Sequence, residues 1–299
     1  MSDPTVPPRE RLAPWLKKRL PNGDTTREVR ELVADLDLHT VCQSARCPNQ
    51  NECWARKAAT FMIMGDLCTR TCRFCTVPKG KPLPLDADEP ERVAEAARRM
   101  ALHHVVVTSV DRDDLPDQGA GHFVRTIEAL RAALPKAVIE VLTPDFRGEP
   151  DCIDAVADAR PHIFNHNTET VPALYAKVRP GARYERSLAL LARVKDRQPK
   201  VHTKSGLMLG LGETAEDLRG VFADLRAHRV DILTLGQYLR PTLAQLPVER
   251  FVPPEEFEAW GREGKAMGFL SVASGPFVRS SYNAAEVYAA IGAPSGAGA

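Results

Sequence analysis

The sequence lacks an excess of either charge and has no long apolar run. Its 40 Lys and Arg residues offset 39 Asp and Glu residues, which leaves a formal net charge of +1. Because nucleic acids and anionic membranes attract basic surfaces, this balance speaks against both as partners. No apolar run approaches the roughly 18 residues that a membrane helix needs. We therefore expect no nucleic-acid partner and no membrane span.

The sequence also lacks an apolar signal segment, and its seven cysteines are an odd number. Disulfide frameworks are typical of small secreted chains, whereas this chain has 299 residues. A chain of that size buries about three quarters of its unfolded surface and needs no disulfides to hold a core. Free thiols in this number favour a reducing compartment, so we expect a cytoplasmic enzyme.

What the chain does have is a concentration of cysteines in two triplets. The first has the spacing C-x4-C-x5-C and the second C-x3-C-x2-C, and they comprise Cys42, Cys47, Cys53 and Cys68, Cys72, Cys75. Thiolates at such spacings bind iron–sulfur clusters, and each triplet is one short of the four ligands that saturate a cubane cluster. An iron without a cysteine can bind a substrate, a cofactor or an unusual protein ligand. The pattern therefore predicts two clusters that take part in chemistry.

Two cysteine triplets are also compatible with three other interpretations. Structural zinc is typical of C-x2-C pairs, but it usually needs two pairs around one ion. A two-cluster electron carrier would account for the cysteines alone, yet such proteins usually complete their sets of four. A zinc-ribbon module that binds nucleic acid would need a basic surface, which the net charge does not favour. The seventh cysteine, Cys152, stands alone in an expected helix and is interpreted as a small buried apolar residue.

Between the two ends, short β-rich runs alternate with longer amphipathic stretches, which predicts an α/β fold with a parallel sheet. The expected strands span residues 60–65, 104–110, 137–143, 162–167, 202–209, 231–236 and 268–273, and the expected helices span 90–102, 119–134, 150–159, 185–198, 214–228 and 254–267. About six strand–helix units predict a partial (βα)6 parallel barrel, short of the closed eight.

Extensions flank this barrel. We expect an N-terminal extension at 1–58 that carries the first cysteine triplet, the barrel at 59–270, and a C-terminal extension at 271–299. The first 25 residues, rich in proline and charge, predict an arm or a mobile leader, and a short helix is expected at 26–37. The tail from Gly292 has the composition of a disordered segment.

In a βα barrel the loops after the C-terminal strand ends build the site, and polar residues recur at these positions. They are Thr108, Ser109, Asp111, Arg112, Asp113 and Asp114 after the second strand, Glu140 and Thr143 at the third, Asn165, His166, Asn167 and Glu169 at the fourth, Lys204 and Ser205 in the fifth, and Gln237 and Tyr238 after the sixth. For several of them, above all Asp113, Asp114 and Glu169, helix capping or surface ion pairing is the alternative.

The second triplet, with Phe74 before its last cysteine, resembles the CxxxCxΦC motif of the radical S-adenosylmethionine (SAM) superfamily. The resemblance implies a partial barrel of the radical SAM type. It also implies that Cys68, Cys72 and Cys75 hold a [4Fe–4S] cluster whose fourth iron is chelated by the amino and carboxylate groups of SAM. Reductive cleavage of SAM would then release a 5′-deoxyadenosyl radical that takes hydrogen from an unactivated carbon.

Two further motifs resemble those of the lipoyl synthase family. They are the first triplet, within CQSARCPNQNEC, and the RSSY sequence at 279–282, and shorter matches extend from about residue 30 to 290. The resemblance implies an auxiliary [4Fe–4S] cluster on Cys42, Cys47 and Cys53 with Ser281 as fourth ligand. This cluster would donate two sulfur atoms to C6 and C8 of a protein-bound octanoyl-lysine. The nearest enzyme alternative is biotin synthase, which also inserts sulfur with the help of SAM.

The resemblance also suggests roles for individual residues. SAM-binding candidates are Asn165 and Asn167 for its ribose or carboxylate, Thr108 or Ser109 for its amino group, and Glu140 as a further cofactor contact, while Arg279 would offset the charge of the auxiliary cluster. Tyr282 is interpreted as a packing residue. Gln118 departs from the family pattern, which has glycine at this position.

The implied partners are proteins as well as SAM. The substrate would be the octanoylated carrier domain of the glycine-cleavage H protein or of a 2-oxoacid dehydrogenase subunit. Reduced ferredoxin or flavodoxin would donate electrons, and an iron–sulfur carrier protein would rebuild the auxiliary cluster. The sequence does not locate the surface on which any of them docks.

Overall fold

The computed structural model describes residues 12–18 and 23–292 and contains one sheet of eight strands. In order across the sheet, the strands are β1 (His39–Thr40), β2 (Thr60–Ile63), β3 (His104–Ser109), β4 (Val138–Leu142), β5 (Ile163–Asn165), β6 (His202–Leu209), β7 (Ile232–Gln237) and β8 (Ser271–Gly275). Strand β1 pairs with β2 antiparallel, and all later neighbours are parallel. The curved parallel sheet confirms the expected partial barrel.

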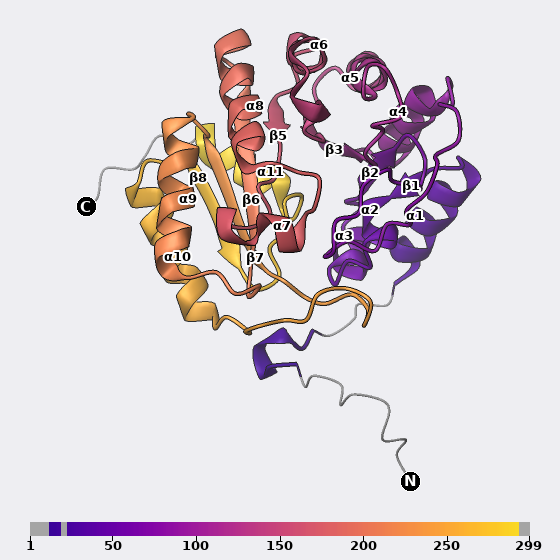
Figure 1. Ribbon diagram of the computed structural model, residues 1–299. Helices are drawn as coiled ribbons and strands as arrows, with labels where there is room; N and C mark the ends of the chain where they lie inside the picture. The colour runs from indigo at the N-terminus through magenta and orange to yellow at the C-terminus, as the bar shows by residue number, and fades with distance from the viewer. Residues whose placement is uncertain (1–11, 19–22, 293–299) are drawn as a thin grey trace.

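Helices follow the parallel strands in turn and cover the outside of the sheet (Figure 1). They are α4 (Glu89–Arg99), α5 (Ala120–Ala133), α6 (Pro150–Asp158), α8 (Tyr184–Arg197), α9 (Ala215–Ala227) and α10 (Pro254–Ala266), with the short α7 (Tyr175–Val178) and the 3-10 turns η2 (Phe146–Gly148) and η3 (Pro172–Leu174) in the loops. This gives the six predicted strand–helix units, and β8 completes the sheet.

The core lies between the sheet and this outer layer of helices. Val105 and Val107 on β3 are fully buried, as are Phe222 on α9 and Phe257 on α10. Strands of a parallel sheet that helices cover are buried along their length and therefore read as short apolar, β-branched runs, which is why these runs predict the strands. Cys152 is buried on α6, as expected for a small apolar residue. Among the described residues, no helix is both long and apolar enough to cross a bilayer.

The N-terminal extension packs against the first edge of the sheet. It contains the turn η1 (Pro14–Leu16) and the helices α1 (Asp24–Asp35), α2 (Val41–Ser44) and α3 (Gln50–Ala55). The leader expected to be mobile is partly anchored, because Leu16 is buried and Lys18 Nζ donates to Asn49 Oδ1 at 2.8 Å. The alternative of a mobile leader is therefore wrong for residues 12–18; residues 1–11 and 19–22 lie outside the described ones.

The C-terminal segment differs from the expectation in two ways. Strand β8 begins three residues later than predicted and belongs to the sheet, beyond the boundary expected at 270. Helix α11 (Ala284–Gly292) is not among the predicted elements, and Gly292 ends it; the rest of the expected tail lies outside the described residues. On α11, Tyr288 makes edge-on ring contacts with His104, His162 and His202, which stand at the starts of strands. Helix α11 therefore lies against the N-terminal end of the barrel.

Candidate active site

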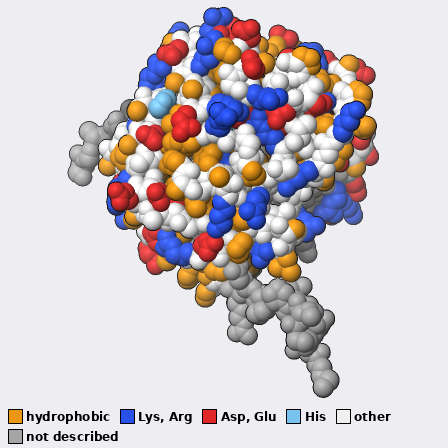
Figure 2. Space-filling model, in the orientation of Figure 1, with side chains coloured by type: hydrophobic (Ala, Val, Ile, Leu, Met, Phe, Trp, Pro, Cys, Tyr) orange, Lys and Arg blue, Asp and Glu red, His pale blue; other side chains and the backbone are white. Residues whose placement is uncertain are grey.

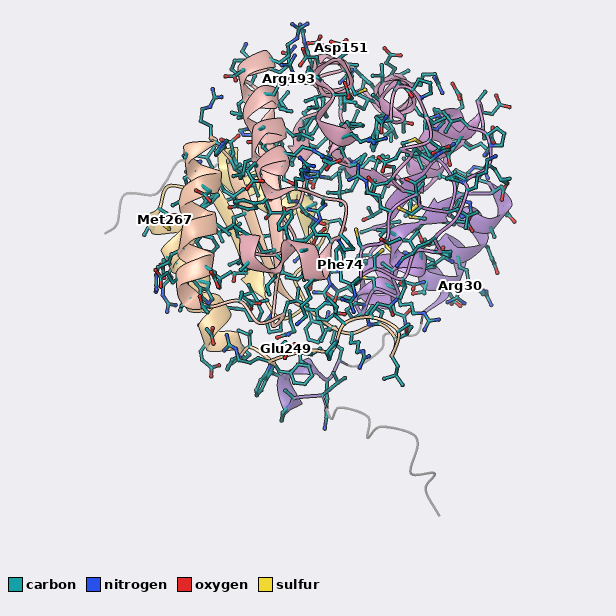
Figure 3. The ribbon with its side chains drawn as sticks, in the orientation of Figure 1. Arg30, Phe74, Asp151, Arg193, Glu249 and Met267 are labelled. Atoms are coloured by element: carbon teal, nitrogen blue, oxygen red, sulfur yellow. The ribbon has the colours of Figure 1, made fainter. Side chains whose placement is uncertain are left out.

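A cavity of about 470 Å³ lies at the C-terminal ends of the parallel strands. Its wall includes Ser109 at the end of β3, Asn167 after β5 and Gly236 on β7, so several strands contribute to one site. Figure 3 shows Phe74 near the middle of the view, facing the space between the N-terminal part of the chain and α7. This is the end of the barrel at which sequence reasoning places the chemistry.

The second cysteine triplet lies on the loop after β2, and all three of its cysteines line the cavity. The Sγ of Cys68 accepts backbone N–H groups of Arg70 at 3.5 Å and Asp111 at 3.4 Å. Burial raises the pKa of Cys68 to about 11 and that of Cys72 to about 12. Thiols with such values ionise readily only beside positive charge, such as that of iron. Donors already aimed at Cys68 would stabilise its thiolate once metal is bound.

In the first triplet, Cys42 lies on the short helix α2, Cys53 on α3, and Cys47 on the turn between them. Cys42 and Cys47 line the same cavity, whereas Cys53 stands behind them and packs on the core. Burial raises the pKa of Cys42 to about 11, with a contribution from the neighbouring Cys47 thiol. Burial together with the charges of Cys42 and Cys47 raises the pKa of Cys53 to about 12. The mutual influence of the three thiols shows that they lie close to one another.

The RSSY segment brings Ser281 and Arg279 to this cavity from the far end of the chain. The side chain of Arg279 is partly buried, and desolvation lowers its pKa while the charges of Cys47 and Glu169 oppose that shift. Arg279, Cys47 and Glu169 all line the cavity, so the charge of Arg279 acts on both the first triplet and this carboxylate. A partly buried cation near Cys47 is suited to offset the negative charge of a thiolate-bound cluster.

Two contacts hold this segment against the N-terminal extension. Asn49 Nδ2 donates to the carbonyl of Phe277 at 2.6 Å, and the hydroxyl of Tyr282 donates to Glu52 Oε1 at 2.8 Å. Tyr282 therefore makes a specific hydrogen bond in addition to the packing expected of it. The two extensions meet beside the first cysteine triplet, although some 228 residues separate Asn49 from Phe277.

The donor sets fit clusters better than a single metal ion. Among residues 12–18 and 23–292, no three His, Cys, Asp or Glu side chains converge on a point where one ion would bind. In a cubane the thiolates bind different irons, so they need not converge. Tetrahedral zinc, in contrast, needs four ligands around one point, and this geometry disfavours it. The cysteines of the described chain are all free, which also excludes disulfides among them.

The cavity also offers unsatisfied polar atoms for an organic ligand. Asn167 Oδ1, Ser109 Oγ and Thr143 Oγ1 are buried without a hydrogen-bond partner, and all three residues line it. Buried polar groups are rarely left unpaired, so this cluster indicates a polar ligand. Glycine at position 206 keeps the space open, because an added Cβ would come within 2.9 Å of Asn167 Oδ1. SAM, with its amino, carboxylate and ribose groups, has the chemistry that these atoms require.

Not every candidate residue reaches the cavity. Thr108, Ser109 and Asn167 line it, but Glu140 and Asn165 do not. Glu140 is fully buried deeper in the barrel, where Lys204 Nζ donates to it at 2.8 Å and Asn165 Nδ2 at 3.2 Å. Their positions therefore give no support to direct cofactor contact by Glu140 or Asn165. The two form a polar layer beneath the site.

The rim carboxylates divide between ion pairing and the cavity. Asp113 binds Arg70 and Asp114 binds Arg112, so these two make the ion pairs that were the alternative to a role in the site. Glu169 instead lines the cavity, and burial raises its pKa against the opposing charge of Arg179.

Arg179 is a site residue that sequence reasoning does not find. It is buried in the cavity wall, donates to the carbonyl of Asn167 at 2.7 Å, and its charge lowers the pKa of Cys72 against the larger effect of burial. The search for polar residues at the ends of expected strands misses Arg179, because this residue follows the short helix α7 and not a strand.

Comparison with known proteins first defines the class of the protein. The model of the radical SAM superfamily matches residues 62–225. The fold resembles the solved structure of HydG, a maturase of the [FeFe]-hydrogenase, with a TM-score of 0.57 and 13% identity over 83% of this chain and 63% of that one. It also resembles methylornithine synthase, with a TM-score of 0.51 and 17% identity over 76% of this chain and 67% of that one. The chain therefore belongs to the radical SAM superfamily, and its fold is that of these enzymes.

Relatives with a higher identity narrow the class further. The N-terminal domain of lipoyl synthase has a family model that matches residues 5–47. The lipoyl synthase of Rubrobacter xylanophilus is 55% identical over 272 residues, which cover 91% of this chain and 85% of the relative. That of Caldanaerobacter subterraneus subsp. tengcongensis is 55% identical over 270 residues, which cover 90% of this chain and 94% of the relative. The chain belongs to the lipoyl synthase family, and the expectation of a sulfur-inserting radical SAM enzyme is confirmed.

Proposed function

We propose that the two cysteine triplets divide the work of sulfur insertion between them. Cys68, Cys72 and Cys75 hold the cluster that faces SAM, and Cys42, Cys47 and Cys53 hold the auxiliary cluster together with Ser281. When bound, the first cluster supplies the electron that cleaves SAM and the second supplies sulfide to the octanoyl chain. The observation that carries this proposal is that members of both triplets and Ser281 line one cavity.

The chain's own residues would orient SAM between the two triplets. Ser109 Oγ and Asn167 Oδ1 are buried acceptors without partners, and they suit the amino and hydroxyl donors of SAM. Arg179 suits its carboxylate, because it stands beside Cys72 with its Nε unpaired. Thr108 Oγ1 already donates to the carbonyl of Leu142 at 3.0 Å, so Ser109 is the better candidate for a contact with SAM.

Ser281 is proposed as the labile ligand of the auxiliary cluster. A serine oxygen is a harder donor than a thiolate and holds iron less firmly, which suits a cluster that gives up sulfide. Arg279 beside Cys47 would stabilise the cluster's negative charge. Arg279 thereby acts on cluster charge and not on SAM.

The substrate is proposed to be octanoyl-lysine on a lipoyl carrier domain, such as the glycine-cleavage H protein or a 2-oxoacid dehydrogenase subunit. A cavity of about 470 Å³ whose lining includes Val77, Leu142 and Met208 suits a flexible acyl arm beside SAM. Reduced ferredoxin or flavodoxin is proposed as electron donor and an iron–sulfur carrier protein as the agent of repair. Free cysteines throughout the described chain suit the reducing cytoplasm.

Iron content and a pair of variant sets test the division of labour. Anaerobic reconstitution should load about eight irons per chain, four for each cubane. Cys68→Ala should abolish 5′-deoxyadenosine formation. Cys42→Ala should preserve SAM cleavage but stop the conversion of an octanoylated carrier to the lipoylated form. Mass spectrometry of the carrier measures this conversion. Cys152→Ala is the matched control, because Cys152 is buried on α6 away from both triplets. Equal loss of both activities in the two sets, or about four irons in the wild-type protein, contradicts the proposal.

A further inference from the structure

A second hollow, of about 580 Å³, opens beside the loop that carries Cys68 and Cys72. We call this hollow the arginine pocket, because four arginines line it. Its lining residues are Arg70, Arg147, Arg183 and Arg186, together with Thr69, Thr71, Asp113 and residues 180–182. Thr69, Arg70 and Thr71 form the segment that joins the two cysteines. Arg70 also lines the main cavity, and its backbone N–H donates to Cys68 Sγ at 3.5 Å. One stretch of chain therefore separates the pocket from a cluster ligand.

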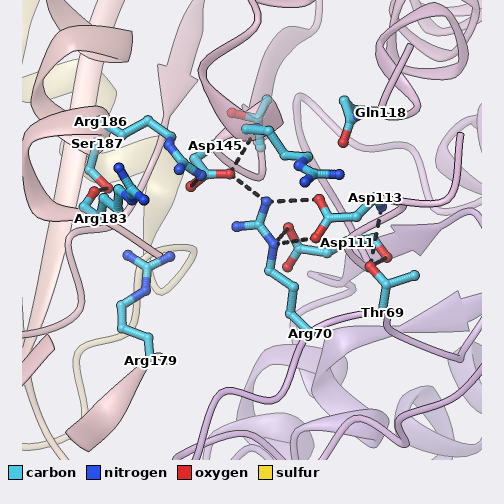
Figure 4. Close-up of polar contacts among 12 residues, drawn as sticks. Thr69, Arg70, Asp111, Asp113, Gln118, Asp145, Arg179, Arg183, Arg186 and Ser187 are labelled. Atoms are coloured by element: carbon cyan, nitrogen blue, oxygen red, sulfur yellow. Dashed lines mark hydrogen bonds and ion pairs between the residues drawn. The ribbon is translucent and has the colours of Figure 1, made fainter. Parts of the chain in front are cut away.

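Asp145, which is fully buried, organises the floor of the arginine pocket (Figure 4). Its Oδ1 lies 2.6 Å from Arg70 Nη2, its Oδ2 accepts from Arg186 Nη1 at 3.0 Å, and its Oδ1 also accepts the backbone N–H of Arg147 at 3.0 Å. Burial opposes ionisation, but the hydrogen bond and charge of Arg70 hold the pKa of Asp145 at about 2. Asp113 adds two bonds to Arg70 at 2.8 Å each. The carboxylates of Asp145 and Asp113 thus offset the charges of Arg70 and Arg186.

The rim of the pocket, in contrast, is left positive. Arg147 and Arg183 are exposed, and neither forms an ion pair with an acidic residue of the described chain. The backbone that presents Arg147 is unusual, because Phe146 and Arg147 both adopt a positive φ, at 45° and 52°. L-residues adopt this conformation at a cost in free energy, and such strain is often retained at functional sites. Figure 2 shows Lys and Arg side chains gathered near the middle of this face.

We propose that the arginine pocket is the docking site of a small acidic protein that donates electrons to the cluster held by Cys68, Cys72 and Cys75; this inference rests on the proposed function. The chain as a whole is nearly neutral, so a positive rim over the cluster loop is a local feature that attracts an acidic partner. Electron transfer slows steeply with distance, and this pocket approaches the cluster ligand without entering the main cavity. The donor loses one electron for each SAM cleaved.

Charge reversal at the rim tests the docking. The double variant Arg147→Glu/Arg183→Glu is compared with Arg30→Glu/Arg262→Glu, which makes the same change in net charge at exposed positions on α1 and α10. With reduced ferredoxin at low ionic strength, 5′-deoxyadenosine formation by the pocket variant should fall about tenfold, and the difference should shrink as salt screens the attraction. With dithionite, which needs no docking site, both variants should match the wild-type enzyme.

Ferredoxin binding to the reconstituted enzyme is measured in parallel, so that docking is judged even without turnover. Unchanged binding and unchanged ferredoxin-driven rates in the pocket variant overturn the inference. A loss seen equally in the control variant also overturns it. A pocket variant that raises the KM for an octanoylated carrier under dithionite, while ferredoxin-driven SAM cleavage stays normal, assigns the surface to the carrier and overturns it as well. Absence of SAM cleavage by the wild-type enzyme under dithionite counts against the proposed function alone.

Discussion

Gly236 on β7 should be essential to the auxiliary site, although it binds nothing in the proposed mechanism. A Cβ added at this position would lie 2.0 Å from the carbonyl oxygen of Val278 and 3.1 Å from Arg279 Nη1. Contacts of this kind below 3.0 Å are essentially never seen, and the carbonyl of Val278 is backbone that cannot rotate away. Alanine at 236 must therefore push the segment that carries Ser281 outward by about 1 Å.

A shift of that size is large compared with the tolerance of a metal ligand. Metal–oxygen bonds of about 2.0–2.2 Å leave no room for 1 Å of movement, and a misplacement of about 1 Å can cost a reaction about 100-fold. Gly236→Ala should lower the conversion of an octanoylated carrier by about that factor. It should leave 5′-deoxyadenosine formation within about twofold of wild type, because Cys68 and its loop are held elsewhere.

Gly275→Ala is the matched control for this variant. A Cβ at 275 would meet the same residue, Val278, but at its Cγ2 and at an ordinary contact distance of 3.5 Å. Neither glycine has a positive φ, so alanine is compatible with the backbone at both positions. Mössbauer or electron paramagnetic resonance spectra of the auxiliary cluster should change in Gly236→Ala and not in Gly275→Ala. Normal sulfur insertion by Gly236→Ala would refute the reasoning.

Two further predictions concern groups buried around the site. Lys204→Met leaves the carboxylate of Glu140 buried without its 2.8 Å partner and should lower the free energy of unfolding by about 3–5 kcal/mol. The double variant Glu140→Gln/Lys204→Met should recover most of this loss, because no buried charge is left unpaired. Urea denaturation measures the stability of both variants, and an equal loss in the double variant contradicts the claim. Burial, with the charge of Arg179, lowers the pKa of His166 from 6.5 to about 4, so between these values the unfolded chain binds a proton that the folded chain does not. Stability should therefore fall as the pH drops from 6.5 toward 4, by at most about 3 kcal/mol, and His166→Gln should flatten this slope; an unchanged slope would count against a neutral His166.

The barrel can be predicted from the sequence because its signals are local. The run 202–209 matches β6 residue for residue, because it is a short segment bounded by the helical stretches 185–198 and 214–228. The strand His39–Thr40 escapes prediction because two residues are too few for a period. Gln118 departs from a glycine position of the family, and its φ of 53° gives the reason for the glycine: the backbone there is left-handed, which glycine adopts more easily than glutamine.

The depth of a residue in the barrel, in contrast, is not encoded in any local pattern. Glu140 and Leu142 point to the same side of β4, but they stand about 7 Å apart along the strand, at roughly 3.3 Å per residue. Leu142 lines the cavity and Glu140 does not. On the neighbouring strand Ile163 lies opposite Glu140 and Asn165 opposite Leu142, but Asn165 does not line the cavity either, so a place beside a lining residue is not sufficient. Register between strands is a tertiary property, so sequence reasoning places Glu140 too near the rim.

The loop of Cys68 and the segment that carries Ser281 are held by different parts of the structure, and this separation gives the proposed division of labour a physical basis. The loop of Cys68 is anchored within the barrel by the backbone of Asp111, which follows β3. Ser281 is placed instead by the contact between the extensions, through Asn49 and Tyr282. Because these contacts lie outside the strand ladder, the segment that carries Ser281 can shift without breaking any strand pair of the barrel. The serine that we propose as the labile ligand would therefore stand where its movement costs the barrel least.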